Sequence, residues 1–162
     1  MKKIFTLLFL ITFSTIVGQE KQSDFWENVR FGGGIGLGFG NNNTTIAVSP
    51  TAVYDFNEQF SLGVSLGYIY NKRGDYKSNV FSGSLLSLYR PYTNIEFSGE
   101  FEQLFVNQKF AIATDNYNYP ALYLGAAYRT RNVSFGLRYD VLYNENKSIY
   151  TSAVSPIIRI FF

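Results

Sequence analysis

The chain has 162 residues, a formal net charge of +2, no cysteine and no histidine. The absence of cysteine excludes disulfides, thiolate nucleophiles and Cys-ligated metal sites, and the absence of histidine excludes the commonest general base and metal ligand. Aromatic residues make up 19% of the chain and charged residues only 16%, which is unusual for a soluble domain, where about a quarter of the residues are charged.

The first 18 residues have the pattern of a secretory signal peptide. Lys2 and Lys3 form a basic start, an apolar stretch covers residues 4–17, and Gly18 is a small residue at the expected cleavage position. An apolar stretch of about 14 residues is shorter than the roughly 20 that a transmembrane helix needs. Removal of this segment takes away two lysines and leaves 12 basic and 12 acidic residues, so the sequence makes no case for nucleic-acid binding.

Residues 19–28 are expected to form a periplasmic N-terminal segment, and residues 29–162 a transmembrane β-barrel. From Phe31 onward, apolar residues alternate with small or polar ones, which is typical of strands with two different faces. The strands are expected at residues 31–40, 45–56, 60–70, 80–89, 95–105, 122–129, 133–143 and 154–162. Their length of about ten residues suits a tilted transmembrane strand. The alternation is least regular in residues 80–89, so the register of the fourth strand stays open.

Two prolines lie inside expected strands, Pro50 in the second and Pro156 in the last. Proline has no N–H to give to a neighbouring strand, so we expect a bulge or a local break in pairing at each.

The connections between the strands alternate in length. Tight turns are expected at residues 55–59, 90–94 and 130–132, and longer loops rich in Asn, Lys and Asp at residues 71–79, 107–118 and 144–148, with a short member at 41–44. Short turns at one end and longer loops at the other are typical of an outer-membrane barrel whose two termini lie on the periplasmic side. The fold class is therefore all-β, an eight-stranded antiparallel up-and-down barrel.

The two faces of the strands differ in chemistry. One face is apolar, and the other carries Gly, Ser, Thr and a few charges. Eight strands enclose an interior only just wide enough for side chains, so we expect the apolar face to point outward into lipid.

Outward aromatic residues are expected to gather at both ends of the strands, as in the aromatic girdles of membrane barrels. β propensity alone explains any single one of them. The periplasmic set is Phe31, Tyr54, Phe60, Tyr89, Tyr128 and Phe162, and the outer set is Phe39, Tyr68, Tyr70, Phe105, Tyr119 and Tyr143.

The charged residues expected on the lumen face are the candidate site residues, because a buried charge must form an ion pair or remain hydrated. We expect an ion-pair network in the lumen that fills the barrel; a gated pore or proton path is the alternative. Two of the inward charges, Asp55 and Arg129, lie outside the expected network. The members of the network are Glu96, Glu100, Glu102, Arg138, Asp140 and Arg159. The adjacent carboxylates Glu100 and Glu102 also fit acid–base work or Ca²⁺, but arginines nearby favour ion pairing. We expect no catalytic residue, no cofactor and no metal.

The chain ends on its last strand, with Ile158, Ile160 and Phe162 on one face. This end resembles the C-terminal strand signature of bacterial outer-membrane proteins that the barrel-assembly machinery reads. The glycines of residues 32–40 alternate onto the lumen face and leave room opposite for Arg159 or Phe161.

The whole mature chain resembles the small eight-stranded barrels of the OmpA/OmpX type, and more closely a group of short outer-membrane proteins of Flavobacterium-like bacteria. The stretches that carry the resemblance are FGGGIGLGFGNN (31–42), IAVSPTAVYDFN (46–57), GEFEQLFVNQ (99–108), GAAYRTRNVSFGLRYDVLYNENKSIY (125–150) and PIIRIFF (156–162). Members of that group sometimes carry an α-ketoglutarate decarboxylase label. A thiamine-dependent decarboxylase needs a metal-binding GDG…N stretch, for which this chain offers only Gly74 and Asp75.

The sequence therefore predicts a non-enzymatic protein of a Gram-negative outer membrane, with a structural or partner-binding role; one such role is an accessory subunit of a larger outer-membrane complex. The alternatives are a narrow channel for ions or small solutes and, more distantly, a secreted lipocalin-like carrier. Expected partners are outer-membrane lipid, the barrel-assembly machinery and an outer-membrane protein. Basic residues of the outer loops are candidates for contact with lipopolysaccharide phosphates: Lys72, Arg73, Lys77, Lys109 and Lys147.

Overall fold

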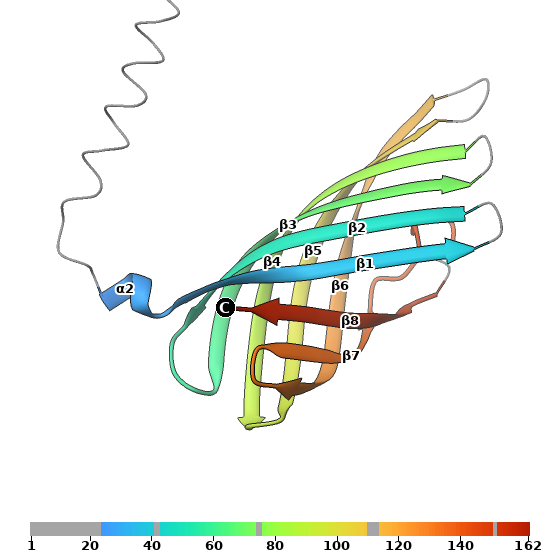
Figure 1. The fold of residues 1–162 in the computed structure, drawn as a ribbon. Helices are drawn as coiled ribbons and strands as arrows, with labels where there is room; N and C mark the ends of the chain where they lie inside the picture. Colours follow the sequence, from blue (N-terminus) through green and yellow to red (C-terminus); the bar gives the residue numbers. More distant parts are fainter. Residues whose placement is uncertain (1–23, 41–42, 74–75, 110–113, 151) are drawn as a thin grey trace, which may run out of the picture.

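Eight antiparallel strands follow one another around a closed barrel in a computed structural model, which describes residues 24–40, 43–73, 76–109, 114–150 and 152–162. Each strand pairs with the next in the chain, and the last returns to the first (Figure 1). This confirms the expected up-and-down barrel; the signal peptide expected at residues 1–18 lies outside the described residues. The elements are α2 (Asp24–Glu27), β1 (Val29–Gly40), β2 (Asn43–Asp55), β3 (Phe60–Arg73), β4 (Tyr76–Tyr92), β5 (Ile95–Lys109), β6 (Thr114–Thr130), β7 (Val133–Asp140) and β8 (Val154–Phe161).

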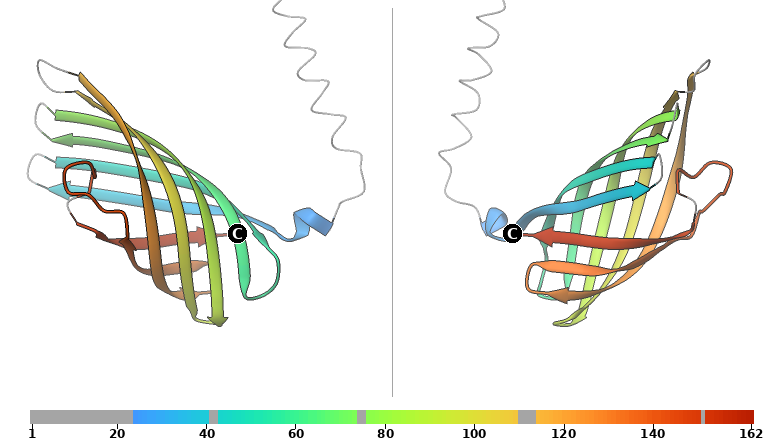
Figure 2. Two further views of the ribbon diagram at one scale, coloured as in Figure 1. Left: turned by 180° about the vertical axis from the view of Figure 1, so that it is seen from behind. Right: turned by 45° about the vertical axis from the view of Figure 1, so that its right-hand side comes forward.

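The two ends of the barrel differ. The turn end holds the short connections at residues 56–59, 93–94 and 131–132, together with α2 and the C-terminus (Figure 1). At the opposite end, the loop end, β3 to β6 extend well beyond β7 and β8, as Figure 2 shows from two further sides. Among the described residues, no helix is long and apolar enough to cross a membrane.

The strands at the loop end run further than expected. Much of the loops expected at residues 71–79 and 107–118 is strand, because β3 and β4 stay paired up to Arg73 and Tyr76, and β5 and β6 up to Lys109 and Thr114. The turn expected at residues 90–94 is likewise confined to 93–94. The polar composition of these segments was the signal for a loop, but the paired strand ends carry the same polar residues.

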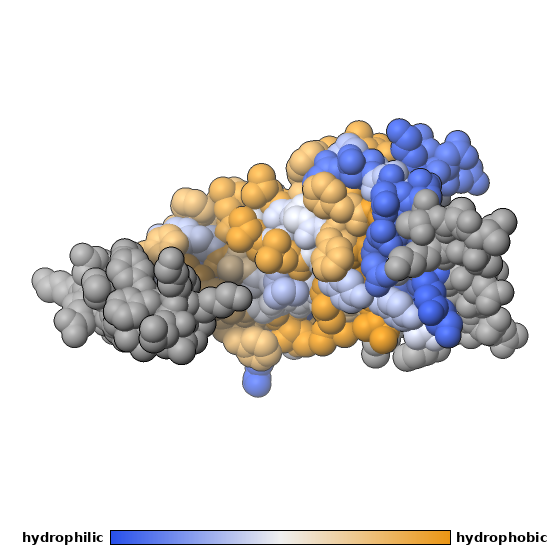
Figure 3. All heavy atoms as spheres, turned by 90° about the horizontal axis from the view of Figure 1, so that it is seen from above, coloured by the Kyte–Doolittle hydropathy of each residue, from blue (hydrophilic) through white to orange (hydrophobic). Residues whose placement is uncertain are grey.

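The alternation of exposed and buried residues follows the expected faces. In β5, Phe97, Phe101 and Phe105 are exposed, whereas Glu100 and Glu102 between them are buried. The fourth strand, whose register the sequence left open, pairs continuously with β3 from Phe60–Tyr89 to Arg73–Tyr76. On the face of the barrel seen in Figure 3, apolar residues are concentrated in the middle and hydrophilic residues gather towards the loop end.

Outward-facing aromatic residues form two rows across β3, β4 and β5, and all but the half-buried Tyr68 are exposed. Phe60, Tyr89 and Phe97 are paired neighbours near the turn end. Tyr68, Phe81 and Phe105 are paired neighbours eight positions further along each strand. Tyr119 was expected in the outer row, and this is wrong: its side chain is buried inside the barrel. Side chains alternate between the two faces of a strand, so Pro120, four residues before the exposed Leu124, points outward and Tyr119 points inward.

Pro50 interrupts pairing as expected. The ladder between β2 and β3 pairs Val48 with Tyr68 and resumes at Thr51 with Ser65, so Ser49 and Pro50 have no partner on that side. On the other side Pro50 stands opposite Gly33, whose φ of 150° is in a region that only glycine adopts readily.

The seventh strand ends earlier than expected. β7 stops at Asp140 instead of continuing to Tyr143. The Asp140 carboxylate Oδ1 accepts the backbone N–H of Leu142 at 3.0 Å, which is the Asx-turn geometry that lets an aspartate redirect its own backbone. Residues 141–153 therefore form the connection to β8 instead of 144–148 alone.

Candidate functional site

The interior of the barrel is arranged in layers along its axis. An apolar cluster near the turn end consists of Val53, Leu86, Leu88 and Phe161. A second cluster, nearer the loop end, consists of Ile69, Val80, Leu104, Val106, Tyr119, Ala121 and Tyr123. The sequence predicted mainly small and charged residues inward, with Phe161 as a larger one. Most of the large apolar side chains from β3 to β6 were missed because these strands carry apolar residues on both faces.

A charged cluster of Glu100, Arg138 and Arg159 lies between the two apolar clusters. Arg138 Nη1 donates to Glu100 Oε2 at 3.1 Å, and Arg159 Nη2 donates to the same oxygen at 3.0 Å. Glu100 Oε1 accepts a hydrogen bond from Ser84 Oγ at 3.0 Å. One carboxylate on β5 thus holds guanidinium groups from β7 and β8.

Arg138 has two further contacts that fix its position. Its Nε donates to Ser155 Oγ at 3.1 Å, and its guanidinium carbon lies 3.9 Å from the centre of the Tyr123 ring. A guanidinium over an aromatic face is attracted by the negative charge of the ring face. The charged cluster is therefore joined to the apolar cluster beside it.

The other three expected members of the network form no ion pair with Arg138 or Arg159. Glu102 is buried beside it and is hydrogen-bonded to Ser82. Asp140 uses Oδ1 for the backbone N–H groups of Leu122 and Leu142. Glu96, only 1% exposed, lies nearer the turn end, and its Oε1 has no hydrogen-bond partner.

A second ion-pair cluster at the turn end is centred on Asp55. Arg30 Nε donates to Asp55 Oδ2 at 2.5 Å, and Arg90 Nη2 donates to Oδ1 at 3.0 Å. The Ser61 hydroxyl also donates to Asp55 and accepts from Arg90. The sequence marked Asp55 as an inward charge but not its partners, because Arg30 precedes the clear alternation and Arg90 was expected in a turn.

The connection between β7 and β8 folds back towards the interior. Ile149 and Tyr150 pack against the apolar cluster near the loop end. The backbone N–H of Ile149 donates to the Tyr119 hydroxyl at 3.1 Å, and the Tyr143 hydroxyl donates to the Tyr150 carbonyl at 3.3 Å. Burial raises the pKa of the Tyr150 hydroxyl above its ordinary value. The segment partly covers the loop end of the lumen.

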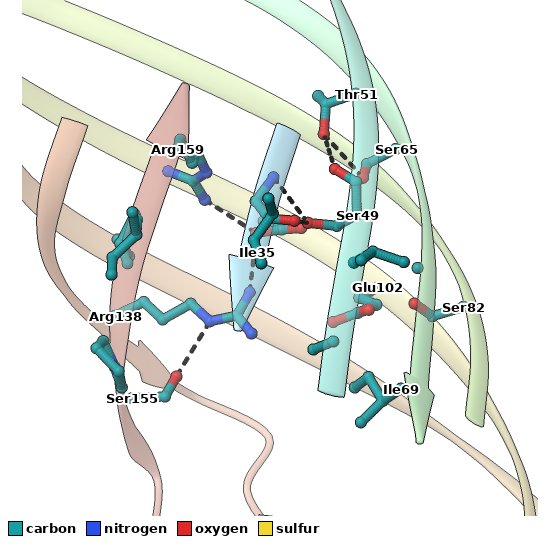
Figure 4. Close-up of a pocket in the computed structure, with 18 of the residues that line it drawn as sticks. Ile35, Ser49, Thr51, Ser65, Ile69, Ser82, Glu102, Arg138, Ser155 and Arg159 are labelled. Carbon is teal, nitrogen blue, oxygen red and sulfur yellow. Dashed lines mark hydrogen bonds and ion pairs between the residues drawn. The ribbon is translucent and has the colours of Figure 1, made fainter. Parts of the chain in front are cut away.

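A cavity of about 390 Å³ adjoins the charged cluster (Figure 4). Its polar lining includes Ser49, Thr51, Ser65, Ser82, Glu100, Glu102, Arg138, Ser155 and Arg159. Thr51 Oγ1 donates to Ser65 Oγ at 3.0 Å on the wall formed by β2 and β3. This volume lies within the range of small-molecule sites, roughly 300–1,000 Å³.

The described residues hold no group of three or more Asp, Glu, His or Cys side chains arranged for a metal ion. What the interior offers is a pair of guanidinium groups, buried carboxylates and several hydroxyls, which suit recognition of a polar group. No protein-family model and no curated protein matches the sequence.

Proposed function

We propose that the chain is an integral outer-membrane β-barrel protein of the small eight-stranded OmpA/OmpX type, with both termini on the periplasmic side. The exposed apolar belt carries this proposal. Leu66 is 70% exposed, Leu85 64% and Phe101 47%, and they lie on adjacent strands between the two aromatic rows. A soluble protein rarely exposes a contiguous apolar surface of this extent.

The height of the belt supports the proposal. The two aromatic rows are eight residues apart on β3, β4 and β5, which is roughly 26 Å along a strand at about 3.3 Å per residue. A strand tilt of about 40° reduces this to roughly 20 Å along the barrel axis, close to the apolar band of about 25 Å in known membrane barrels.

The role that fits the interior is structural or partner-binding, including that of an accessory subunit. The two apolar clusters and the charged cluster between them occupy the lumen at several levels. They favour a filled barrel over the narrow channel. Lys72, Arg73 and Lys77 on the paired ends of β3 and β4 are candidates for lipopolysaccharide phosphates.

The membrane proposal is tested by placing a charge on the belt. Leu85 pairs with Val64 and Phe101, midway between the aromatic rows. Leu85→Lys should cost about 2–4 kcal/mol of unfolding free energy in lipid vesicles, as lysine does at a bilayer midplane, whereas Tyr92→Lys at the turn end should cost under about 1 kcal/mol. Equal costs, or recovery of the wild-type chain in the soluble fraction without detergent, would favour the carrier instead.

The partner-binding role is tested in the native membrane. Tagged protein extracted in mild detergent should retain a membrane protein at a constant ratio, and that complex should survive a second purification through the partner. A chain that migrates as a monomer under all mild extraction conditions would leave only the structural role.

A further inference from the structure

The seam between β1 and β8 is much shorter than the other ladders of the barrel. Within the described residues, the two strands pair only at Gly32–Phe161, Gly33–Ile160 and Gly34–Arg159. Both strands continue towards the loop end, β1 through residues 35–40 and β8 through residues 154–158, without pairing to each other. The wall is thus closed by main-chain bonds near the turn end alone.

Pro156 explains why β8 presents a poor edge to β1. The Phe161 N–H donates towards β7, to Asn132, and the Phe162 N–H donates towards β1, to Phe31. N–H direction alternates along an antiparallel strand, so the even-numbered positions of β8 face β1. Position 156 is one of them, and proline has no N–H to offer there.

The cavity beside the charged cluster reaches through this seam. Its lining includes the outward-facing Ile35 of β1 and Ile158 of β8, which flank the unpaired stretch, together with the inward-facing Arg159. A closed sheet separates outward from inward side chains by its backbone. A cavity lined by both kinds at the unpaired stretch is therefore a lateral opening from the outer surface into the lumen. Figure 4 shows Ile35 and Arg159 on facing strands beside this cavity.

The inner end of the opening has an excess of hydrogen-bond donors. Arg138 and Arg159 share a single oxygen of Glu100, and Arg159 Nη1 has no hydrogen-bond partner although Arg159 is only 9% exposed. Glu102 also lines the cavity, but Ser82 is its hydrogen-bonding partner. Arg159 Nη1 is therefore a buried donor that is left for a further acceptor, and a carboxylate suits it because charge-assisted hydrogen bonds are the stronger kind.

We propose that this opening admits a single-chain amphiphile with a carboxylate headgroup, of the fatty-acid class, from the surrounding lipid. The headgroup binds at Arg138 and Arg159, and the chain extends between Ile35 and Ile158 towards the hydrocarbon. Because serine, threonine and glycine have small side chains, the cavity that they line is wide enough for the acyl chain of the ligand. This inference rests on the proposed membrane location.

Binding of radiolabelled dodecanoate to the protein in phosphatidylcholine nanodiscs, corrected for protein-free discs, tests the proposal. We expect saturable binding of one dodecanoate per chain. Arg159→Gln should weaken it at least about tenfold, because a charge-assisted hydrogen bond is lost. Arg90→Gln, which removes an arginine of the turn-end cluster, should leave the affinity within about twofold. Dodecylamine should not compete.

A second pair of variants tests the route without touching the charges. Ile35→Trp narrows the opening and should reduce binding severalfold, whereas Leu66→Trp, on the outward face away from the seam, should not. Equal binding by Ile35→Trp and Leu66→Trp would overturn the lateral route, and competition by dodecylamine would overturn the carboxylate preference. Discs that hold the folded barrel but bind no dodecanoate would refute this inference alone, whereas a chain that enters no disc would refute the membrane location.

Discussion

Glu100 accepts a hydrogen bond from each of two arginines through a single carboxylate oxygen. At an exposed surface such a group would compete with water, but here it lies between two apolar clusters. Removing one partner of a buried ion pair is costly because the remaining charge is left without compensation. The three side chains are therefore expected to act as a unit.

Glu100→Gln tests this dependence. The variant removes the charge of the one carboxylate that pairs with both Arg138 and Arg159 and should lower the free energy of unfolding by about 3–5 kcal/mol. Urea unfolding in detergent micelles, followed by circular dichroism, measures it. The control is Glu58→Gln in the exposed turn after β2, which should change stability by less than about 0.5 kcal/mol. Equal effects of the two substitutions would contradict a structural role for the charged cluster.

Gly33 and Gly83 form a matched pair of glycines for a second test. Gly33 has a φ of 150°, and a Cβ there would overlap the carbonyl oxygen of Ser49; a Cβ at Gly83 would meet nothing within 4 Å. Gly33→Ala should cost about 1–3 kcal/mol through backbone strain, whereas Gly83→Ala should stabilise by up to about 1 kcal/mol. The same unfolding experiment measures the sign of both changes in the free energy of unfolding. A Gly33→Ala variant with unchanged stability would show that β1 can shift away from β2.

At the scale of strands, alternation predicted the fold well because each strand separates two unlike surroundings. The strand ends were harder to predict. β7 stops where the Asp140 side chain accepts a hydrogen bond from a backbone N–H, and such a contact does not alter the alternation of residues in the sequence. The candidate site was predicted in part. Glu100, Arg138 and Arg159 come together, but Arg30 and Arg90 were missed because Arg30 precedes the regular alternation and Arg90 was expected in a turn.

The connection between β7 and β8 depends on the Tyr119 hydroxyl. Tyr119→Phe removes the acceptor of the Ile149 N–H. Loss of this hydrogen bond costs about 1 kcal/mol, which raises the equilibrium constant for local opening of the segment about fivefold. Cleavage by trypsin at the exposed Lys147 should accelerate by that factor under conditions where cleavage follows the opening equilibrium. Tyr92→Phe, at the turn end, should leave the rate unchanged. A rate that Tyr119→Phe leaves unaltered would show that packing of Ile149 and Tyr150 alone holds this segment.

At the scale of the whole molecule, the filled interior predicts a barrel that does not conduct. Purified protein in planar bilayers should give no reproducible unitary currents, because apolar clusters lie on both sides of the charged cluster. Heat-denatured protein prepared in the same detergent serves as the control for leakage. Steady currents that Arg138→Ala or Glu100→Gln abolishes would overturn the filled-barrel interpretation and favour the narrow channel.

The short seam also sets the order in which the barrel can assemble. Each hairpin joins strands that are neighbours in the chain, whereas the Gly34–Arg159 pair closes a loop of 125 residues. By chain statistics this closure costs roughly 4 kcal/mol of entropy. In the described part of the chain, three residue pairs and the hydrogen bond from Phe162 to Phe31 offset this cost by main-chain bonding. The open, curved sheet of eight strands is therefore expected to form before the cylinder, and the seam is the last part to close and the first to reopen.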